Sequence, residues 1–137
     1  MIPEIKENFA RQGMMHTLGA RIDEVGDGYV LLSAPITTSV SQQQGFAHAG
    51  LTFALGDSAS GYAALTRMPR GADVLTVEMK INLIAPATGV RLWAHGDVVK
   101  AGRRLVITRA RVESEAEDGT RRDVAILQGT MIPVLDG

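Results

Sequence analysis

The 137-residue sequence contains no cysteine, and its aromatic residues are one tryptophan, two tyrosines and three phenylalanines. The missing thiol excludes cysteine nucleophiles, disulfide bonds and cysteine metal sites, and it agrees with a reducing cytoplasm. The few aromatic rings offer little surface for stacking nucleic-acid bases, and the formal net charge of -1 with scattered basic residues argues against a surface for a nucleic-acid backbone. The composition therefore argues against nucleic acid as a partner, and the length predicts a single domain over residues 1–137.

The amino-acid sequence also argues against a targeting segment and against a membrane span. The opening stretch, MIPEIKENFARQG, lacks the basic start and continuous apolar run of a signal peptide. Residues 29–47 carry no charge, but Pro35 and a run of threonine, serine and glutamine exclude a membrane span. We therefore expect a cytoplasmic protein without a membrane partner.

One stretch, residues 47–66, has Asp57 as its only certain charge. Apolar and small residues recur on every side, which is typical of a helix buried all round. The predicted helix spans about residues 49–67, and it ends there because Pro69 favours an extended conformation at the residue before it. An ionised carboxylate in apolar surroundings costs several kcal/mol unless it is paired or protonated. Asp57 is therefore either hydrogen-bonded for structure or retained for chemistry.

The rest of the chain reads as strands joined by turns, after a short N-terminal helix over residues 3–12. Strands are expected over residues 18–25, 29–36, 75–83, 91–100, 105–115 and 124–134. In the strand after the central helix, apolar residues alternate with polar ones, which predicts one buried face formed by Leu75, Val77, Met79, Ile81 and Leu83. The element order predicts an α+β fold, in which one antiparallel sheet has its concave face filled by the helix.

Residues around this helix resemble the hotdog-fold acyl-CoA thioesterases, specifically the PaaI-like, phenylacetate-degradation branch of the 4-hydroxybenzoyl-CoA thioesterase superfamily. The positions that carry the resemblance are Gly45, His48, Gly50, Asp57, Ala59 and Gly61, followed by Thr76-Val77-Glu78-Met79 and Pro86-Ala87. The resemblance spans about residues 15–134. It implies a hotdog fold, hydrolysis of acyl-CoA thioesters without a metal or other cofactor, and homodimers that pair into homotetramers.

The resemblance also implies residue roles. Asp57 falls on the catalytic acid of the family, His48 on its histidine, and Thr76 on a hydroxyl residue that helps to hold the attacking water. Gln42 stands where an asparagine is usual, so the amide is retained but lies one methylene further out. Ala49 replaces the first glycine after the histidine, which keeps the backbone N–H and narrows the cleft by a methyl group.

The chemistry is consistent with the residues themselves. A thioester carbonyl develops negative charge on oxygen when it is attacked, and the N–H groups of Ala49 and Gly50, unpaired at a helix N-terminus, are suited to hold it. Asp57 would either deprotonate a water molecule or attack the carbonyl to form an anhydride. Ala49 and Asp57 lie about 12 Å apart along one helix, so a single carbonyl cannot contact both. If both act, they come from two subunits, and the mechanism requires a homodimer.

Each candidate also has a structural interpretation. His48 can serve as a helix cap or a core histidine. Lys100, Arg103 and Arg104 are either a solvated turn or contacts to coenzyme A phosphates. The three histidines show no metal-ligand spacing. A non-enzymatic acyl-CoA binding module and a hotdog hydratase or dehydratase remain alternatives to the thioesterase, although the motifs of the hydratases and dehydratases are absent. The acyl group cannot be read from the chain, because residues of two subunits would line its pocket.

Overall fold

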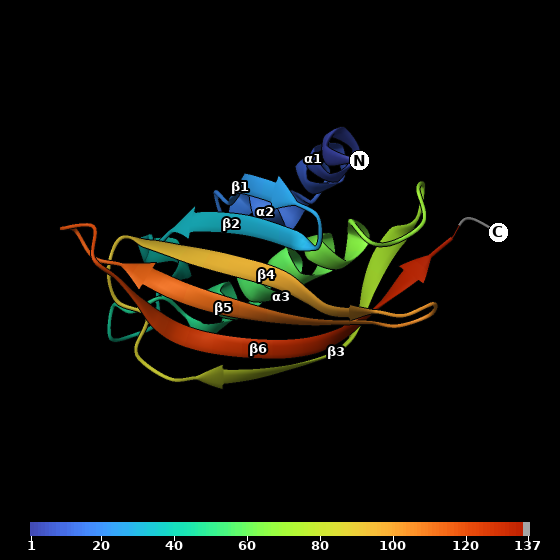
Figure 1. The fold of residues 1–137 in the computed structure, drawn as a ribbon. Helices are drawn as coiled ribbons and strands as arrows, with labels where there is room; N and C mark the ends of the chain where they lie inside the picture. The colour runs from blue at the N-terminus through green and yellow to red at the C-terminus, as the bar shows by residue number, and fades with distance from the viewer. Residues whose placement is uncertain (136–137) are drawn as a thin grey trace.

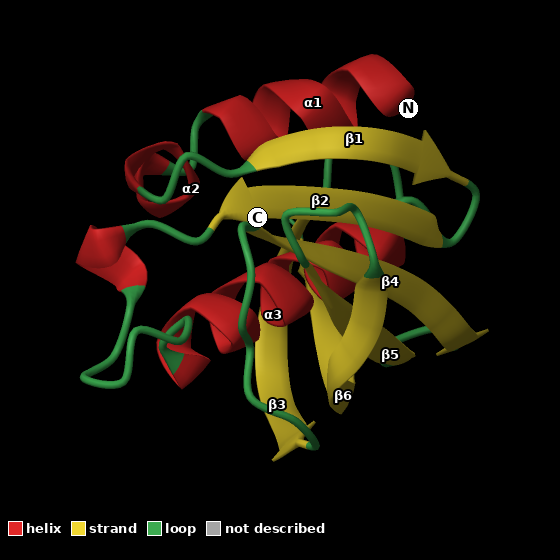
Figure 2. Cartoon of the chain, turned by 90° about the vertical axis from the view of Figure 1, so that its left-hand side faces the viewer, coloured by secondary structure: helices red, strands yellow, loops and turns green. Residues whose placement is uncertain are grey.

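Six antiparallel strands curve around one long helix in the computed structural model, which describes residues 1–135. The strands form one sheet in the order β1-β2-β4-β5-β6-β3, and the helix α3 lies against its concave face (Figures 1 and 2). The elements are α1 (Ile2–Ala10), α2 (Gly13–Thr17), β1 (Arg21–Gly26), β2 (Tyr29–Pro35), the 3-10 helix η1 (Thr38–Val40), α3 (Ala49–Leu65), β3 (Asp73–Leu83), β4 (Arg91–Ala101), β5 (Val106–Glu115) and β6 (Arg121–Val134). The predicted antiparallel sheet around a central helix is confirmed.

Two glycines allow α3 and the sheet to approach each other closely. A Cβ atom on Gly96 of β4 would lie 2.3 Å from the carbonyl oxygen of Ala59, and one on Gly56 of α3 would lie 2.8 Å from a methyl group of Leu127. At Gly96 the obstacle is backbone, so this contact requires glycine, whereas at Gly56 the side chain of Leu127 would have to move. This close fit fixes how far α3 can shift along the sheet, and with it the position of every residue on the helix.

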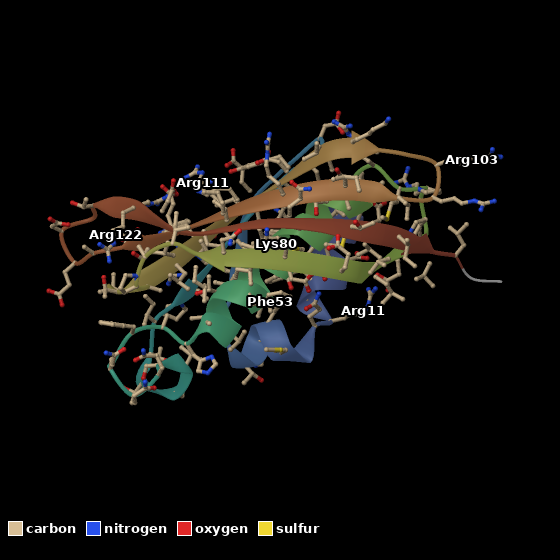
Figure 3. All side chains as sticks on the ribbon, turned by 90° about the horizontal axis from the view of Figure 1, so that it is seen from below. Arg11, Phe53, Lys80, Arg103, Arg111 and Arg122 are labelled. Atoms are coloured by element: carbon tan, nitrogen blue, oxygen red, sulfur yellow. The ribbon has the colours of Figure 1, made fainter. Side chains whose placement is uncertain are left out.

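One stripe of α3 is not covered by the sheet. Its members recur three or four positions apart and are partly or fully exposed: Ala49, Gly50, Phe53, Ala54, Asp57 and Ser58. Figure 3 shows the labelled Phe53 on this side of the helix. The prediction of a helix buried all round is therefore wrong for the single chain. The sheet covers one side of the helix, and the uncovered side carries mostly small or apolar residues, so composition could not distinguish the two sides.

The strand β3 also differs from its prediction. Leu75, Val77 and Leu83 are 57, 56 and 55 % exposed, although the alternating pattern placed them on a buried face. One cause is that β3 lies at the edge of the sheet, where it pairs with β6 alone. A second cause is a register shift between Thr76 and Glu78, which leaves Val77 as an extra residue in a β-bulge. The alternation before the bulge is therefore out of phase with the alternation after it.

The N-terminal helix predicted over residues 3–12 is present as α1, and a second helix, α2, follows it that was not predicted. The first, α1, packs through Ile5, which is fully buried, and through Phe9, whose ring meets that of Tyr62 edge-on at 5.9 Å between centroids. The second, α2, has five residues, too few for a helical period to show in the sequence. Within residues 1–135, none of the helices combines the length and apolar character that crossing a bilayer requires.

Candidate active site

Asp57 lies on the uncovered stripe of α3 and is only partly exposed. Thr76 donates a hydrogen bond from Oγ1 to Oδ1 of Asp57 at 2.6 Å. Burial raises the pKa of Asp57, and the hydrogen bond from Thr76 acts in the opposite direction without cancelling that effect. The sequence predicts that Thr76 helps to hold the attacking water, and the structure places its hydroxyl directly on the carboxylate of Asp57, whose pKa is raised.

A cleft of about 230 Å³ opens beside this carboxylate, and we refer to it as the Asp57 cleft. It is formed by residues of α1, α3 and β3, including Asn8, Asp57, Ser58, Tyr62 and Thr76, and by Gln12 in the turn between α1 and α2. The contribution of the N-terminal segment was not predicted. Asn8 lies on α1, whereas Gln12 is the extended residue that precedes α2, so helical spacing in the sequence could not have paired them.

Gln42, His48 and Ala49 lie around a different cavity, of about 550 Å³, at the beginning of α3. We refer to it as the helix-start pocket. Its walls are largely apolar and include Phe46, Leu83, Ile84, Ala85 and Val124. Some of this apolar surface comes from the end of β3, which explains why the exposed Leu83 is not simply a surface residue.

His48 caps the first turn of α3. Its backbone is extended, with φ -62° and ψ 142°, and its Nδ1 accepts a hydrogen bond from the N–H of Gly50 at 2.8 Å. The prediction that both N–H groups are unpaired is therefore wrong for Gly50. The N–H of Ala49 has no partner within residues 1–135 and remains available as a donor. The structural interpretation of His48 as a cap is confirmed.

The side chain of Gln42 forms hydrogen bonds within its own loop. Its Oε1 accepts hydrogen bonds from the backbone N–H groups of Gln44 and Phe46, the latter at 3.3 Å. Its Nε2 donates to Oε1 of Gln44 at 3.1 Å. These bonds shape the turn that leads into α3, so the amide has a structural task besides any contact with water or substrate.

Within one chain, the predicted site residues fall into two separate groups. Asp57 and Thr76 line the Asp57 cleft, whereas Gln42, His48 and Ala49 line the helix-start pocket, and no residue lines both cavities. Both groups nevertheless share α3, which contains Ala49 and Asp57 at positions eight residues apart. The spacing argument from the sequence is therefore supported: one chain alone does not bring the acid and the helix start together.

The basic residues of the β4–β5 turn belong to neither group. Lys100, Arg103 and Arg104 are exposed, and none of them forms an ion pair with another residue in the described part of the chain. Figure 3 shows Arg103 at the end of the sheet opposite to the beginning of α3. As for a metal, the described 135 residues contain no group of three or more histidine, aspartate or glutamate side chains arranged to hold one.

Residues 44–120 match the sequence model of the family described as the thioesterase superfamily. The chain belongs to the thioesterase superfamily. The match includes α3, β3 and the β4–β5 hairpin, and so it contains Asp57 and Thr76.

Members of the thioesterase superfamily with solved structures share the fold. A thioesterase family protein from Silicibacter pomeroyi is 41% identical, with 98% of each chain covered and a TM-score of 0.96. The PaaI protein from the phenylacetic acid degradation operon of E. coli is 18% identical and shows the fold alone, with 93% of this chain and 88% of that chain covered and a TM-score of 0.81. A putative esterase from Saccharolobus solfataricus is 26% identical over 131 residues, which are 96% of this chain and 84% of the relative. The expected hotdog fold is confirmed, and the family is one of thioester hydrolases.

Proposed function

We propose that the protein hydrolyses an acyl-CoA to a free acid and coenzyme A at a site shared by two copies of the chain. In this proposal Asp57 of one subunit acts on the thioester carbonyl, and the beginning of α3 of the other subunit holds the oxyanion. The observation that carries the proposal is the division of the site residues between two cavities along one helix. A two-fold arrangement of antiparallel α3 helices would place the start of each beside Asp57 of the other.

Two uncovered surfaces support this homodimer. The stripe of α3 that the sheet leaves open runs from Ala49 to Ser58 and carries Asp57. The edge strand β3 exposes Leu75 and Val77 together with unpaired backbone groups, which is the arrangement that favours pairing with another strand. A second copy of the chain would cover both surfaces. Pairing of dimers into a homotetramer stays a prediction from the family resemblance.

The proposed reaction requires few groups. Asp57 either takes a proton from water, which attacks the thioester carbon, or attacks that carbon itself to form an anhydride that water then cleaves. Thr76 keeps the carboxylate in place. The negative charge on the carbonyl oxygen is held by the N–H of Ala49, at the positive end of the α3 dipole. When the C–S bond breaks, coenzyme A leaves as a thiolate, so a strong general acid is not needed.

The basic turn fits the same arrangement. Because the turn lies at the end of the sheet opposite to the start of its own α3, a two-fold partner would bring it toward the start of the other α3 (Figure 3). We therefore assign to Lys100, Arg103 and Arg104 contacts with the phosphates of coenzyme A, since cationic side chains form strong charge-assisted hydrogen bonds with phosphate oxygens.

One observation favours a second function, the binding of acyl-CoA without hydrolysis. The N–H of Gly50 is already used by the cap from His48, which leaves the oxyanion one free backbone donor, from Ala49. Removing a single oxyanion donor typically lowers a rate by ~10²- to 10³-fold. If His48 keeps its cap when the substrate is bound, the protein would bind acyl-CoA but turn it over slowly. Neither the contacts of the site nor the names of the relatives favour a hydratase or dehydratase.

The test combines coenzyme A release with subunit mixing. Wild-type protein is assayed over aromatic and aliphatic acyl-CoA esters, and two variants are prepared, Asp57→Asn and Ala49→Pro. Proline fits at the first residue of α3, because the N–H of Ala49 has no partner and His48 is extended, as a residue before proline should be. Each variant alone should be nearly inactive.

Mixing the two variants gives the decisive result. After dissociation and random reassociation, about half of the dimers carry both defects in one site and none in the other. Activity should recover to roughly a quarter of the wild-type value. Mass spectrometry that shows exchanged subunits without recovered activity would place the whole site within one chain. Wild-type protein that binds acyl-CoA but releases no coenzyme A would favour the binding function instead.

A further inference from the structure

The hairpin of β4 and β5 extends past the neighbouring strand β2. Pairing of β2 with β4 stops at Tyr29, which lies opposite Asp97, so residues 99–101 have a free sheet edge on that side. The hairpin itself is closed by a hydrogen bond from the N–H of Gly102 to the carbonyl oxygen of Leu105 at 2.8 Å. We refer to residues 99–105, which include the basic turn, as the β4–β5 tip. Its backbone is fixed by these contacts, and one side of it is open.

Two apolar side chains of the β4–β5 tip point away from the core. A register shift between Val98 and Lys100 leaves Val99 as an extra residue in a β-bulge. Val98 packs against the core, whereas Val99 is 51 % exposed. On the other side of the turn, Val106 is buried and Leu105 is 50 % exposed. The tip therefore presents a valine and a leucine that the core does not use.

The same tip carries an excess of positive charge. Residues 98–108 contain three basic residues and no acidic residue. The three are Lys100, Arg103 and Arg104, and no ion pair within residues 1–135 involves them. Two acidic side chains of other segments are engaged elsewhere, because Asp27 pairs with Arg67 and Asp73 accepts a hydrogen bond from Asn8. The tip is thus suited to attract an acidic partner and to accelerate its association.

The combination of charge and apolar surface narrows the kind of partner. Phosphate groups alone would bind the cations and leave Val99 and Leu105 in water. A lysine at a free sheet edge also hinders pairing with other strands, but this does not account for Arg103 and Arg104 in the turn. Protein–protein interfaces, in contrast, combine a few apolar anchors with arginine side chains.

The proposed two-fold dimer argues against a membrane as that partner. Each β4–β5 tip lies at the end of its sheet opposite to the start of its own α3, as Arg103 shows in Figure 3. With antiparallel α3 helices, the two tips then lie at opposite ends of the dimer, so a flat membrane would contact one of them. A separate protein can bind to each tip.

We infer that the β4–β5 tip docks an acidic carrier protein that bears the acyl thioester on a phosphopantetheine arm. Val99 and Leu105 contact its surface, and the basic residues contact its acidic side chains. Coenzyme A contains the same arm, so one site serves both thioesters, and water cleaves the C–S bond to give a free acid and the thiol of the arm. The inference rests on the proposed function, since it names the carrier of the proposed acyl group.

The experiment compares one acyl group on two carriers. Hexanoyl-CoA and a bacterial acyl carrier protein loaded with hexanoyl-phosphopantetheine are assayed for thiol release, and kcat/KM is measured for each. For the wild type, kcat/KM should be about tenfold higher with the carrier protein, and added salt should reduce this preference because it screens the charges. Val99→Ser and Leu105→Ser should each lower kcat/KM for the carrier protein by about tenfold, mainly through KM, and leave hexanoyl-CoA unaffected.

Two further variants separate the contacts. Arg103→Ala should weaken both substrates, because the cation serves phosphates and acidic side chains alike. The matched control is Ile126→Ser, since Ile126 is 48 % exposed on β6 and lies outside the tip, and both substrates should react with it as with the wild type. Melting temperatures are recorded for all variants. They should stay close to that of the wild type, because the replaced side chains are half exposed.

Three results would overturn the inference. One is a wild-type kcat/KM that is no higher for the carrier protein than for hexanoyl-CoA. Another is that Val99→Ser and Leu105→Ser leave the carrier protein unaffected or slow both substrates equally. The third is sedimentation of the wild type with vesicles of phosphatidylcholine and phosphatidylglycerol that Val99→Ser abolishes, which would assign the tip to a membrane. Failure of the proposed function looks different, because then neither thioester is cleaved, and the same criteria apply to Kd values from calorimetry.

Discussion

The beginning and the middle of α3 offer opposite chemistry. At the beginning, the useful group is the backbone N–H of Ala49, and the nearby side chains of Gln42 and His48 are occupied in shaping the loop and capping the helix. In the middle, the useful groups are side chains, a carboxylate and the hydroxyl of Thr76. The N-terminal dipole favours negative charge, but its influence fades within the first turn. A helix can thus present an anion-holding end and, two turns further on, an aspartate whose pKa burial raises.

Of the variants that test this contrast, Asp57→Asn should have the largest effect. If the carboxylate acts only on the way to the transition state, kcat should fall by ~10³-fold or more while acyl-CoA binding is kept, because ground-state contacts remain. Coenzyme A release and calorimetry measure the two quantities. Asp118→Asn, at the exposed β5–β6 turn, is the matched control and should have wild-type activity. Turnover near that of the wild type in Asp57→Asn would contradict the assignment.

The same variant has a stability signature. Because the pKa of Asp57 is raised by folding, the folded chain binds more protons than the unfolded chain at pH values between the ordinary and the raised pKa, so stability falls as the pH rises through that window. At neutral pH the wild type carries this cost, and Asp57→Asn should melt at a slightly higher temperature. The difference should vanish below the ordinary pKa of aspartic acid. A lower melting temperature at neutral pH would identify Asp57 as structural.

Thr76→Val should lower the rate less than Asp57→Asn does. It should also shift the pH dependence of kcat/KM. The hydrogen bond from Thr76 lowers the pKa of Asp57, so its loss should raise that pKa further. If ionised Asp57 is required, the acidic limb of the kcat/KM profile should move to higher pH, with a loss of roughly tenfold at neutral pH. Thr130→Val, which removes a similar hydroxyl bonded to Glu78, should leave the profile unchanged. If the acidic limb of the kcat/KM profile does not shift in Thr76→Val, Thr76 does not act on the carboxylate used in the reaction.

The smallest effect is expected at the beginning of α3, at Gln42. Because its amide oxygen already accepts two backbone N–H groups, Gln42→Ala should lower the melting temperature and reduce kcat by less than tenfold. Gln42→Asn carries the amide usual in the family and should recover part of the lost rate. Thermal melts and the coenzyme A assay are run together. A loss of kcat in Gln42→Ala without any change in melting temperature would show that the amide acts on water or substrate.

The sequence predicted best those features that depend on local rules. The beginning of α3 at Ala49, the hairpin turns and the sheet around a central helix all follow from capping, turn residues and periodicity. The family resemblance singled out both Asp57 and Thr76, but their direct hydrogen bond is a finding of the structure. The 1.5 Å rise of a helix sufficed to predict that Ala49 and Asp57 would not converge within one chain.

Features that depend on the rest of the fold were missed. The cap from His48 to Gly50 depends on a side-chain rotamer, which spacing does not specify. The open stripe on α3 depends on how far the sheet curves, and its residues are as small and apolar as those that the sheet covers. The contribution of Asn8 and Gln12 to the Asp57 cleft requires α1 to pack beside Tyr62, a contact between segments about fifty residues apart.

The bulge at Val77 changes which residues of β3 face the helix α3. A strand assigns its residues alternately to two faces, so one inserted residue exchanges the faces of everything that follows. Before Val77, the even-numbered Thr76 faces α3, and after it the odd-numbered Met79 does so, while Glu78 bonds to Thr130 away from the helix. One inserted residue thus lets a single strand deliver a hydroxyl to Asp57 and still turn its later charged residues toward solvent.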